Sequence, residues 1–171
     1  TVGLVDEALH ASRVAEYLRV ATANLDPANI TSVVAHLVRA AQDPTFSWDP
    51  GAVTVDGLDA TWSMLEGWED TGDFQVMYLH WLLRLGQGVV DPEVLARIEA
   101  ELLAFRYRYD DPLPAGRLDH KWFWSENHRL IFLVDEYLAG TWMPDRTFAV
   151  TGLTGAEHAA RSRPDILAWV R

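Results

Sequence analysis

The chain has 171 residues, no cysteine and a formal net charge of −11 at pH 7. This length fits one domain or part of a larger one, and 49% hydrophobic with 23% charged residues is ordinary for a packed globular chain. The absence of cysteine excludes disulfides, thiolate catalysis and cysteine-ligated zinc, and it leaves the cellular compartment open. An acidic chain is a poor general binder of nucleic acid, and no apolar run is long enough for a membrane span.

Apolar residues recur at helical spacing along most of the chain and predict about six helices of roughly 10–17 residues, together with a short one over residues 58–68. The longer segments are residues 5–20, 27–41, 73–85, 92–105 and 123–138, and a last helix from Thr154 onwards. Strand signals are sparse. The sequence therefore predicts an all-α fold.

The helix boundaries follow from capping residues and breakers. Asp26 and Pro27 fit an N-cap followed by proline at the first helical position, and Thr154 with Glu157 forms a capping box. Pro164 should kink or restart the last helix. Prolines and glycines interrupt residues 43–59, within which residues 52–55 fit a short strand.

Short connections between helices favour antiparallel helical hairpins. The apolar pattern also continues to the last residue without a cap. We therefore expect residues 1–171 to form a single helical domain that is the N-terminal portion of a larger one.

One stretch, residues 119–137, crowds polar, titratable and aromatic side chains ahead of a strong helical pattern. On a helix it places Asn127 in the centre of an apolar stripe that includes Phe123, Trp124 and Leu130. A buried asparagine without a hydrogen-bond partner costs about 1–3 kcal/mol. This helix should therefore carry a structural polar network or line a cavity.

The same helical geometry places Ser125, Arg129 and Glu136 on the opposite face, towards water. It places His128 and Asp135 on one shoulder of the stripe, two turns apart. If the segment is purely structural, these two residues form a boundary pair.

The adjacent Asn127 and His128 resemble the Asn-His element of helical-toroid polysaccharide lyases, such as the alginate lyases and heparinase-like enzymes. This resemblance implies an (α/α) toroid and β-elimination on uronate-containing glycans. It implies that Asn127 neutralises the uronate carboxylate and that His128 takes the proton from C5. Independently of the resemblance, Glu126 is a further catalytic candidate, as one of the carboxylates of this stretch. Residues 123–128 and 153–158 also resemble parts of large bacterial helical proteins that have no assigned activity.

Side chains near the Asn-His pair suit substrate binding. Trp122, Trp124 and His120 are candidates for substrate binding, and tryptophan suits stacking on a sugar ring. Arg117, Lys121 or Arg129 could assist with an anionic group. Residues 106–109 alternate arginine with tyrosine, a pattern found on edges that face RNA or sugar. We expect a poly- or oligosaccharide partner, with no nucleic acid, membrane, metal or cofactor.

Two other interpretations remain open. A pair of carboxylates on a helical scaffold can also perform glycoside hydrolysis, provided that the two groups lie about 5–10 Å apart. In the non-enzymatic interpretation the chain is a helical scaffold or protein-interaction domain, and its aromatic residues fill the contacts between helices.

Overall fold

A computed structural model of the chain describes residues 6–170. This part contains seven α-helices, two short 3-10 helices and no β-strand, which confirms the predicted all-α fold. The helices are α1 (Glu7–Ala21), α2 (Ile30–Gln42), α3 (Asp59–Glu66), α4 (Gly72–Leu85), α5 (Pro92–Ala104), α6 (Glu126–Trp142) and α7 (Gly155–Trp169), with η1 (Pro50–Ala52) and η2 (Asp56–Leu58) between α2 and α3. Residue 5, the predicted start of the first helix, lies outside the described residues.

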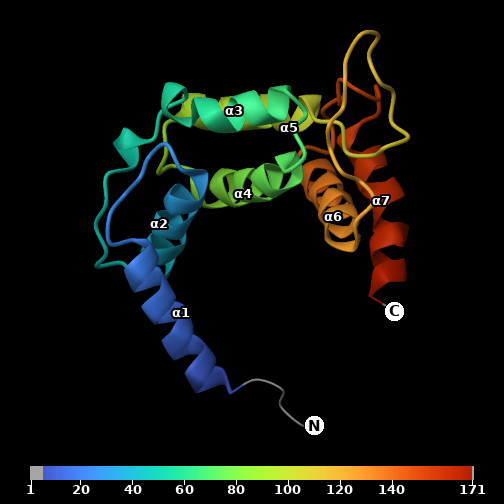
Figure 1. Cartoon of the computed structure of the whole chain (residues 1–171). Coiled ribbons are helices and arrows are strands. Elements are labelled where there is room, and N and C mark those ends of the chain that lie inside the picture. The colour runs from blue at the N-terminus through green and yellow to red at the C-terminus, as the bar shows by residue number, and fades with distance from the viewer. Residues whose placement is uncertain (1–5, 171) are drawn as a thin grey trace.

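The helices form an arch (Figure 1). Helix α4 contacts α2 on one side and α6 on the other, and these three helices make the inner row. Helices α3 and α5 pack on the outer side of α4, and α7 packs on α6. Helix α1 extends from α2 at one end of the arch. Its only fully buried side chain is Leu18, so α1 is the least anchored of the described helices.

Helix α5 runs antiparallel to α4, and α6 runs parallel to α4. The start of α4 at Gly72 faces Phe105 after the end of α5, and Gly86 after α4 faces Leu95 near the start of α5. Two hydrogen bonds join α4 to α6, and each links residues that are 55 positions apart in the sequence. A constant offset of this kind requires the two helices to run in the same direction.

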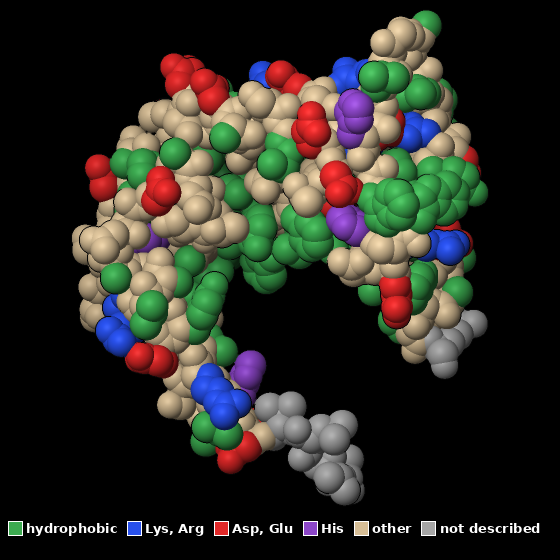
Figure 2. All heavy atoms as spheres, viewed as in Figure 1, with side chains coloured by type: hydrophobic (Ala, Val, Ile, Leu, Met, Phe, Trp, Pro, Cys, Tyr) green, Lys and Arg blue, Asp and Glu red, His purple; other side chains and the backbone are tan. Residues whose placement is uncertain are grey.

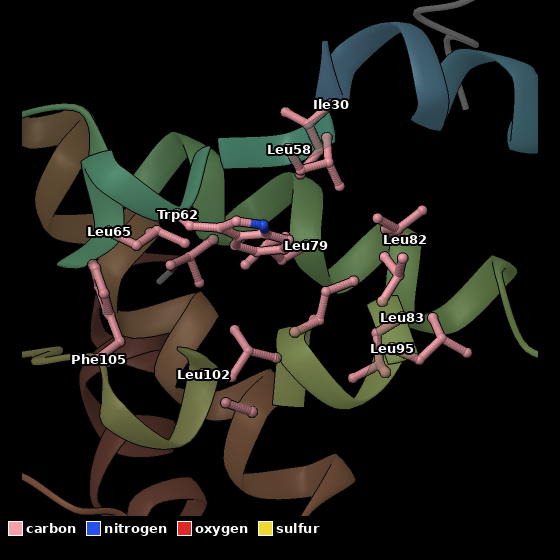
Figure 3. Close-up of a cluster of buried hydrophobic side chains, with 14 of the residues drawn as sticks. Ile30, Leu58, Trp62, Leu65, Leu79, Leu82, Leu83, Leu95, Leu102 and Phe105 are labelled. Atoms are coloured by element: carbon pink, nitrogen blue, oxygen red, sulfur yellow. The ribbon is translucent and has the colours of Figure 1, made fainter. Parts of the chain in front are cut away.

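The core lies between α2, α3, α4 and α5 (Figure 3). Leu79 and Leu82 of α4 and Ile98 and Leu102 of α5 are fully buried. Trp62 of α3 packs into the same core and donates its indole N–H to the carbonyl oxygen of Val55 at 2.7 Å. A buried tryptophan N–H needs a hydrogen-bond acceptor, and this carbonyl oxygen supplies it.

Helices α6 and α7 approach most closely through glycine. A Cβ at Gly140 would lie 2.4 Å from the carbonyl oxygen of Gly155, and a Cβ at Gly155 would lie 2.1 Å from that of Met143. No side chain fits at either position, so both glycines are required for this contact.

The structure corrects three predicted boundaries. Helix α2 begins at Ile30 with Asn29 as its N-cap, so Pro27 lies in the preceding turn. Residues 52–55 form no strand, because Ala52 is the last residue of η1 and residues 53–55 link η1 to η2. Helix α7 continues through Pro164 without a break, and its predicted capping box at Thr154 is confirmed.

Hydrophobic side chains line the inner edge of the arch (Figure 2). In α4, Phe74 and Tyr78 are half-buried and Trp81 is 51% exposed. The predicted apolar face of this helix is therefore only partly covered, and the core is filled instead by neighbours such as Val76 and Leu79. No helix within residues 6–170 is both long enough and apolar enough to cross a membrane.

Candidate functional site

Helix α6 begins at Glu126, three residues later than predicted. Ser125 is its N-cap residue and has extended backbone angles (φ −80°, ψ 155°). Phe123 and Trp124 therefore lie in the extended segment before the helix, and they do not share a helical stripe with Asn127.

Asn127 is exposed, so the prediction that it is buried in an apolar stripe is wrong. Its Oδ1 accepts a hydrogen bond from the hydroxyl of Ser125 at 2.8 Å. Glu126, the first residue of α6, is exposed as well. The physical reason is the late start of α6, because an amide in the first helical turn reaches water.

His128 pairs with Asp73 of α4 instead of Asp135. Its Nδ1 lies 2.7 Å from Asp73 Oδ2, and its side chain is 13% exposed. The edge of the ring packs against Phe74 at 5.2 Å between centroids. Burial raises the pKa of Asp73, and the nearby His128 partly offsets this rise. Because Asp73 binds Nδ1, the pair has the geometry of an oriented base.

Lys121 is buried and does not offer its ammonium group to a surface ligand. Its Nζ lies 3.1 Å from Asp119 Oδ1 and 4.2 Å from the centroid of the Trp68 ring. Burial lowers the pKa of Lys121 to about 8, and the Asp119 carboxylate opposes this shift. These contacts tie the segment before α6 to the turn after α3.

The other predicted binding residues are spread over the surface near Lys121. The Arg117 guanidinium lies 4.0 Å above the Trp68 ring. His120 is exposed and its backbone N–H donates to the Trp68 carbonyl oxygen at 3.1 Å. Trp122 is 54% exposed, and its backbone N–H donates to Asp70.

Glu136 was predicted to face water, but it is fully buried between α6 and α7. Its carboxylate contacts His158 Nδ1 at 2.7 Å, Arg108 Nε at 2.7 Å and the Arg161 guanidinium. His158 Nε2 in turn lies 2.7 Å from the hydroxyl of Thr151. Hydrogen bonds from His158 and Arg108 and the charge of Arg161 lower the pKa of Glu136, although burial alone would raise it.

A pocket of about 530 Å³ opens beside α6, next to the loop of residues 107–110 and the end of α7. Its walls come from residues 107–110, from residues 123 and 124 with one face of α6, and from the end of α7. Trp124 is 67% exposed and stacks at a tilt on Tyr109, with 4.8 Å between ring centroids. Trp169 of α7 lines another part of the wall.

Two arginines and two aspartates surround these aromatic rings. Arg108 donates to Glu136 and, at 2.9 Å, to Asp165 Oδ2, so its charge is already neutralised. The exposed side chains of Arg129 and Asp110 form no hydrogen bond or ion pair with the residues that the structure describes. Arg129 is thus the pocket cation that remains free to meet a ligand.

Arg106 holds the pocket wall in place. Its buried guanidinium pairs with Asp119 and donates to the carbonyl oxygens of Tyr109 and Asp111. Asp111 also accepts two hydrogen bonds from Arg161 of α7, at 2.8 and 3.0 Å. The loop that carries Tyr109 is therefore fixed at both ends.

Of the predicted binding residues, Trp124 lines this pocket. The alternation of arginine and tyrosine in residues 106–109 pointed towards it, although Arg106 and Tyr107 are mainly structural. Nothing in the sequence marked Trp169 as a pocket residue, whereas Arg129 was among the basic residues that could assist near the Asn-His pair. Within residues 6–170, no group of three or more histidine, aspartate or glutamate side chains is arranged to hold a metal ion.

No family model matches the sequence, and neither a curated protein nor a solved structure matches the chain. The site is therefore interpreted from its own geometry.

Proposed function

We propose that this protein binds an oligosaccharide in the pocket between the loop of residues 107–110, α6 and α7. The observation that carries the proposal is the exposed pair of Tyr109 and Trp124 in a pocket that Trp169 lines from another element. Exposed aromatic rings on separate walls suit the flat, apolar faces of sugar rings. A volume of about 530 Å³ lies in the range of small-molecule sites.

The charged groups of the pocket suit a sugar that carries a carboxylate. Arg129 is free to bind an anionic group, and an arginine can bind a carboxylate through two hydrogen bonds. The hydroxyl groups of the sugar would meet Asp110 and the Arg108–Asp165 pair. A uronate-containing glycan is therefore the ligand class that this pocket supports best.

The arrangement of helices agrees with part of an (α/α) toroid. Helices α2, α4 and α6 form one row, α3, α5 and α7 lie outside it, and α4 and α6 run parallel. In this proposal the pocket lies at the edge of such a toroid, among the segments that precede and follow α6.

The test is binding of neutral and uronate oligosaccharides to wild type, Trp124→Ala and Trp122→Ala, measured by calorimetry. Trp124→Ala should weaken binding about tenfold, because removing a stacked ring costs about 1.4 kcal/mol. Trp122 is the matched control, since it is an exposed neighbour outside the pocket wall. Arg129→Gln should weaken binding of the uronate ligand more than that of the neutral one.

Equal losses in the two tryptophan variants would contradict the pocket assignment. If no oligosaccharide in the panel binds, the non-enzymatic scaffold becomes the better interpretation. The exposed Trp81 and the apolar inner edge of the arch would then be its contact surface.

A second candidate, uronate elimination, is favoured by the Asp73–His128 pair. Asp73 holds Nδ1, which directs the free electron pair of His128 Nε2 outwards as a base. This nitrogen would remove the C5 proton, and the electron pair of the broken C5–H bond would form the C4–C5 double bond as the C4–O bond breaks. The leaving glycosidic oxygen keeps the pair of that bond and takes a proton from water. Unsaturated uronate absorbance in the same panel, lost in His128→Ala, tests this chemistry.

A further inference from the structure

Two aspartate–histidine pairs join α4 to α6. Asp73 pairs with His128 at 2.7 Å, and His80 Nε2 lies 3.1 Å from the backbone oxygen and 3.7 Å from the Oδ1 of Asp135. Each helix contributes one aspartate and one histidine, and the order of the two is reversed between the helices. The pairs therefore lie two helical turns apart along one contact.

These groups are almost completely buried. The side chains of Asp73 and Asp135 are 0% and 2% exposed, and that of His80 is 3% exposed. Asp73 Oδ1, His80 Nδ1 and Asp135 Oδ2 have no hydrogen-bond partner among the described residues. A buried carboxylate with an unpaired oxygen is costly when it is charged.

We propose that these four side chains form a pH-dependent latch, which holds α4 against α6 while Asp135 is protonated and releases it when both aspartates ionise. The His80 Nε2–H donates to the Asp135 backbone carbonyl, and burial keeps the ring neutral near pH 7 because it lowers the pKa of His80 to about 4. A neutral His80 gives no positive charge to an ionised Asp135. Ionisation therefore leaves an uncompensated anion inside the contact, with the Asp73 carboxyl on the same helix pair.

The neighbouring elements supply no compensating cation at Asp135. The segment after α5 places the Tyr107 phenol near it, and burial, followed by the charges of Asp135 and Glu136, raises the pKa of Tyr107. The ring of Trp142, at the end of α6, packs edge-on against His80 at 4.9 Å. The arginines of this region, Arg108 and Arg161, are bound to Glu136.

The direction of the pH effect follows from the buried groups. Burial, together with the charge of Asp73, holds the pKa of Asp135 well above 3.8 in the folded protein. The stability that the protonated Asp135 contributes is therefore lost as pH rises through this folded-state pKa. Burial lowers the pKa of His80 from 6.5 to about 4, so its effect is lost as pH falls through that interval. These two contributions oppose each other below pH 6.5. Above it His80 is neutral in both states, and the aspartates alone weaken the contact.

The test is urea unfolding of wild type and Asp135→Asn between pH 6.5 and 8. The unfolding constant of wild type should rise by up to about tenfold per pH unit, the limit for one proton released on unfolding. Asp135→Asn should remove this rise, because an amide resembles the protonated acid and does not ionise. The upper limit is pH 8 because Lys121, with a pKa of about 8, is already half deprotonated there and would dominate the pH dependence above it.

Asp145→Asn is the matched control, since Asp145 is an exposed carboxylate beyond the end of α6. It should keep the rise seen in wild type. The proposal is overturned if wild type shows no rise, or if Asp135→Asn rises as steeply as Asp145→Asn.

Hydrogen exchange of wild type provides a test that needs no variant. Between pH 6.5 and 8, after correction for the intrinsic exchange rate, the amides of α4 and α6 that exchange by local opening should lose at least tenfold more protection than such amides of α2. Equal loss in all three helices would overturn the latch, because the pH effect would then not be located at this contact.

Discussion

A buried carboxylate depends on the number and geometry of its partners. Glu136 is fully buried, yet its two oxygens receive hydrogen bonds from a histidine and two arginines. Asp135, the preceding residue, is equally buried and has an unpaired oxygen. The pKa of Glu136 is accordingly lowered and that of Asp135 raised, although the two residues are adjacent in the sequence.

Glu136→Gln should therefore destabilise the protein strongly. The change leaves Arg108 and Arg161 without the charge that balances them, and breaking a buried ion pair costs about 3–5 kcal/mol. Urea unfolding at pH 7 measures the effect. Glu99→Gln is the control, because Glu99 forms an exposed pair with Arg146 that should contribute under about 1 kcal/mol. Similar losses in both variants would show that Glu136 has no special role.

The helical period could not reveal which polar side chains are buried in α6. A helical wheel built on the apolar residues placed Glu136 on the face towards water, because such a wheel assumes that a helix has one buried face. In the structure α6 is covered by α4 on one side and α7 on another, so its polar residues are buried on both. The partners of Glu136 lie 22 to 28 residues away along the chain, which local patterning does not register.

At the scale of elements, the sequence predicted helices well and their exact ends less well. Periodicity and capping located every helix, and the capping box set the start of α7. The start of α6 was placed too early because Phe123 and Trp124 continue its apolar pattern. Both residues lie before the helix, where Phe123 is buried in the core and Trp124 lines the pocket. That early start led to the wrong prediction for Asn127.

Gly140→Ala should separate α6 from α7. Its Cβ would meet the backbone oxygen of Gly155 at 2.4 Å, and backbone cannot rotate away as a side chain does. Overpacking of this kind costs about 1–3 kcal/mol or more, measurable as a lower thermal midpoint. Gly51→Ala is the comparison, because its nearest neighbour is a side-chain oxygen at 3.2 Å. An unchanged midpoint in Gly140→Ala would mean that the two helices are not in close contact in solution.

At the scale of the whole molecule, the all-α class followed from the sequence and the pocket did not. The pocket combines residues 107–110, residues 123 and 124 with one face of α6, and the end of α7. The parallel packing of α4 and α6 likewise depends on contacts between residues 55 positions apart. No local pattern specifies which of several possible helix pairs will meet in three dimensions.

Stability should decrease towards the α1 end of the arch. With Leu18 as its only fully buried residue, α1 has little apolar surface to hold it in place. Native-state hydrogen exchange should therefore show opening of α1 at a much lower free energy than opening of α5, which buries Ile98 and Leu102 completely. Equal protection of α1 and α5 would contradict this gradient.

Helix α7 meets α6 in close glycine contact at its first turn and lines the pocket near its last turn. Gly155, at its start, is the pivot, and Trp169 lies near its other end, roughly 20 Å away at 1.5 Å per residue. The bond from Arg108 to Asp165 restrains the far arm beside the pocket. A small tilt at the pivot would therefore move the Trp169 wall further than it moves the pivot itself. A substitution at either of these glycines, neither of which lines the pocket, should therefore change the width of the pocket.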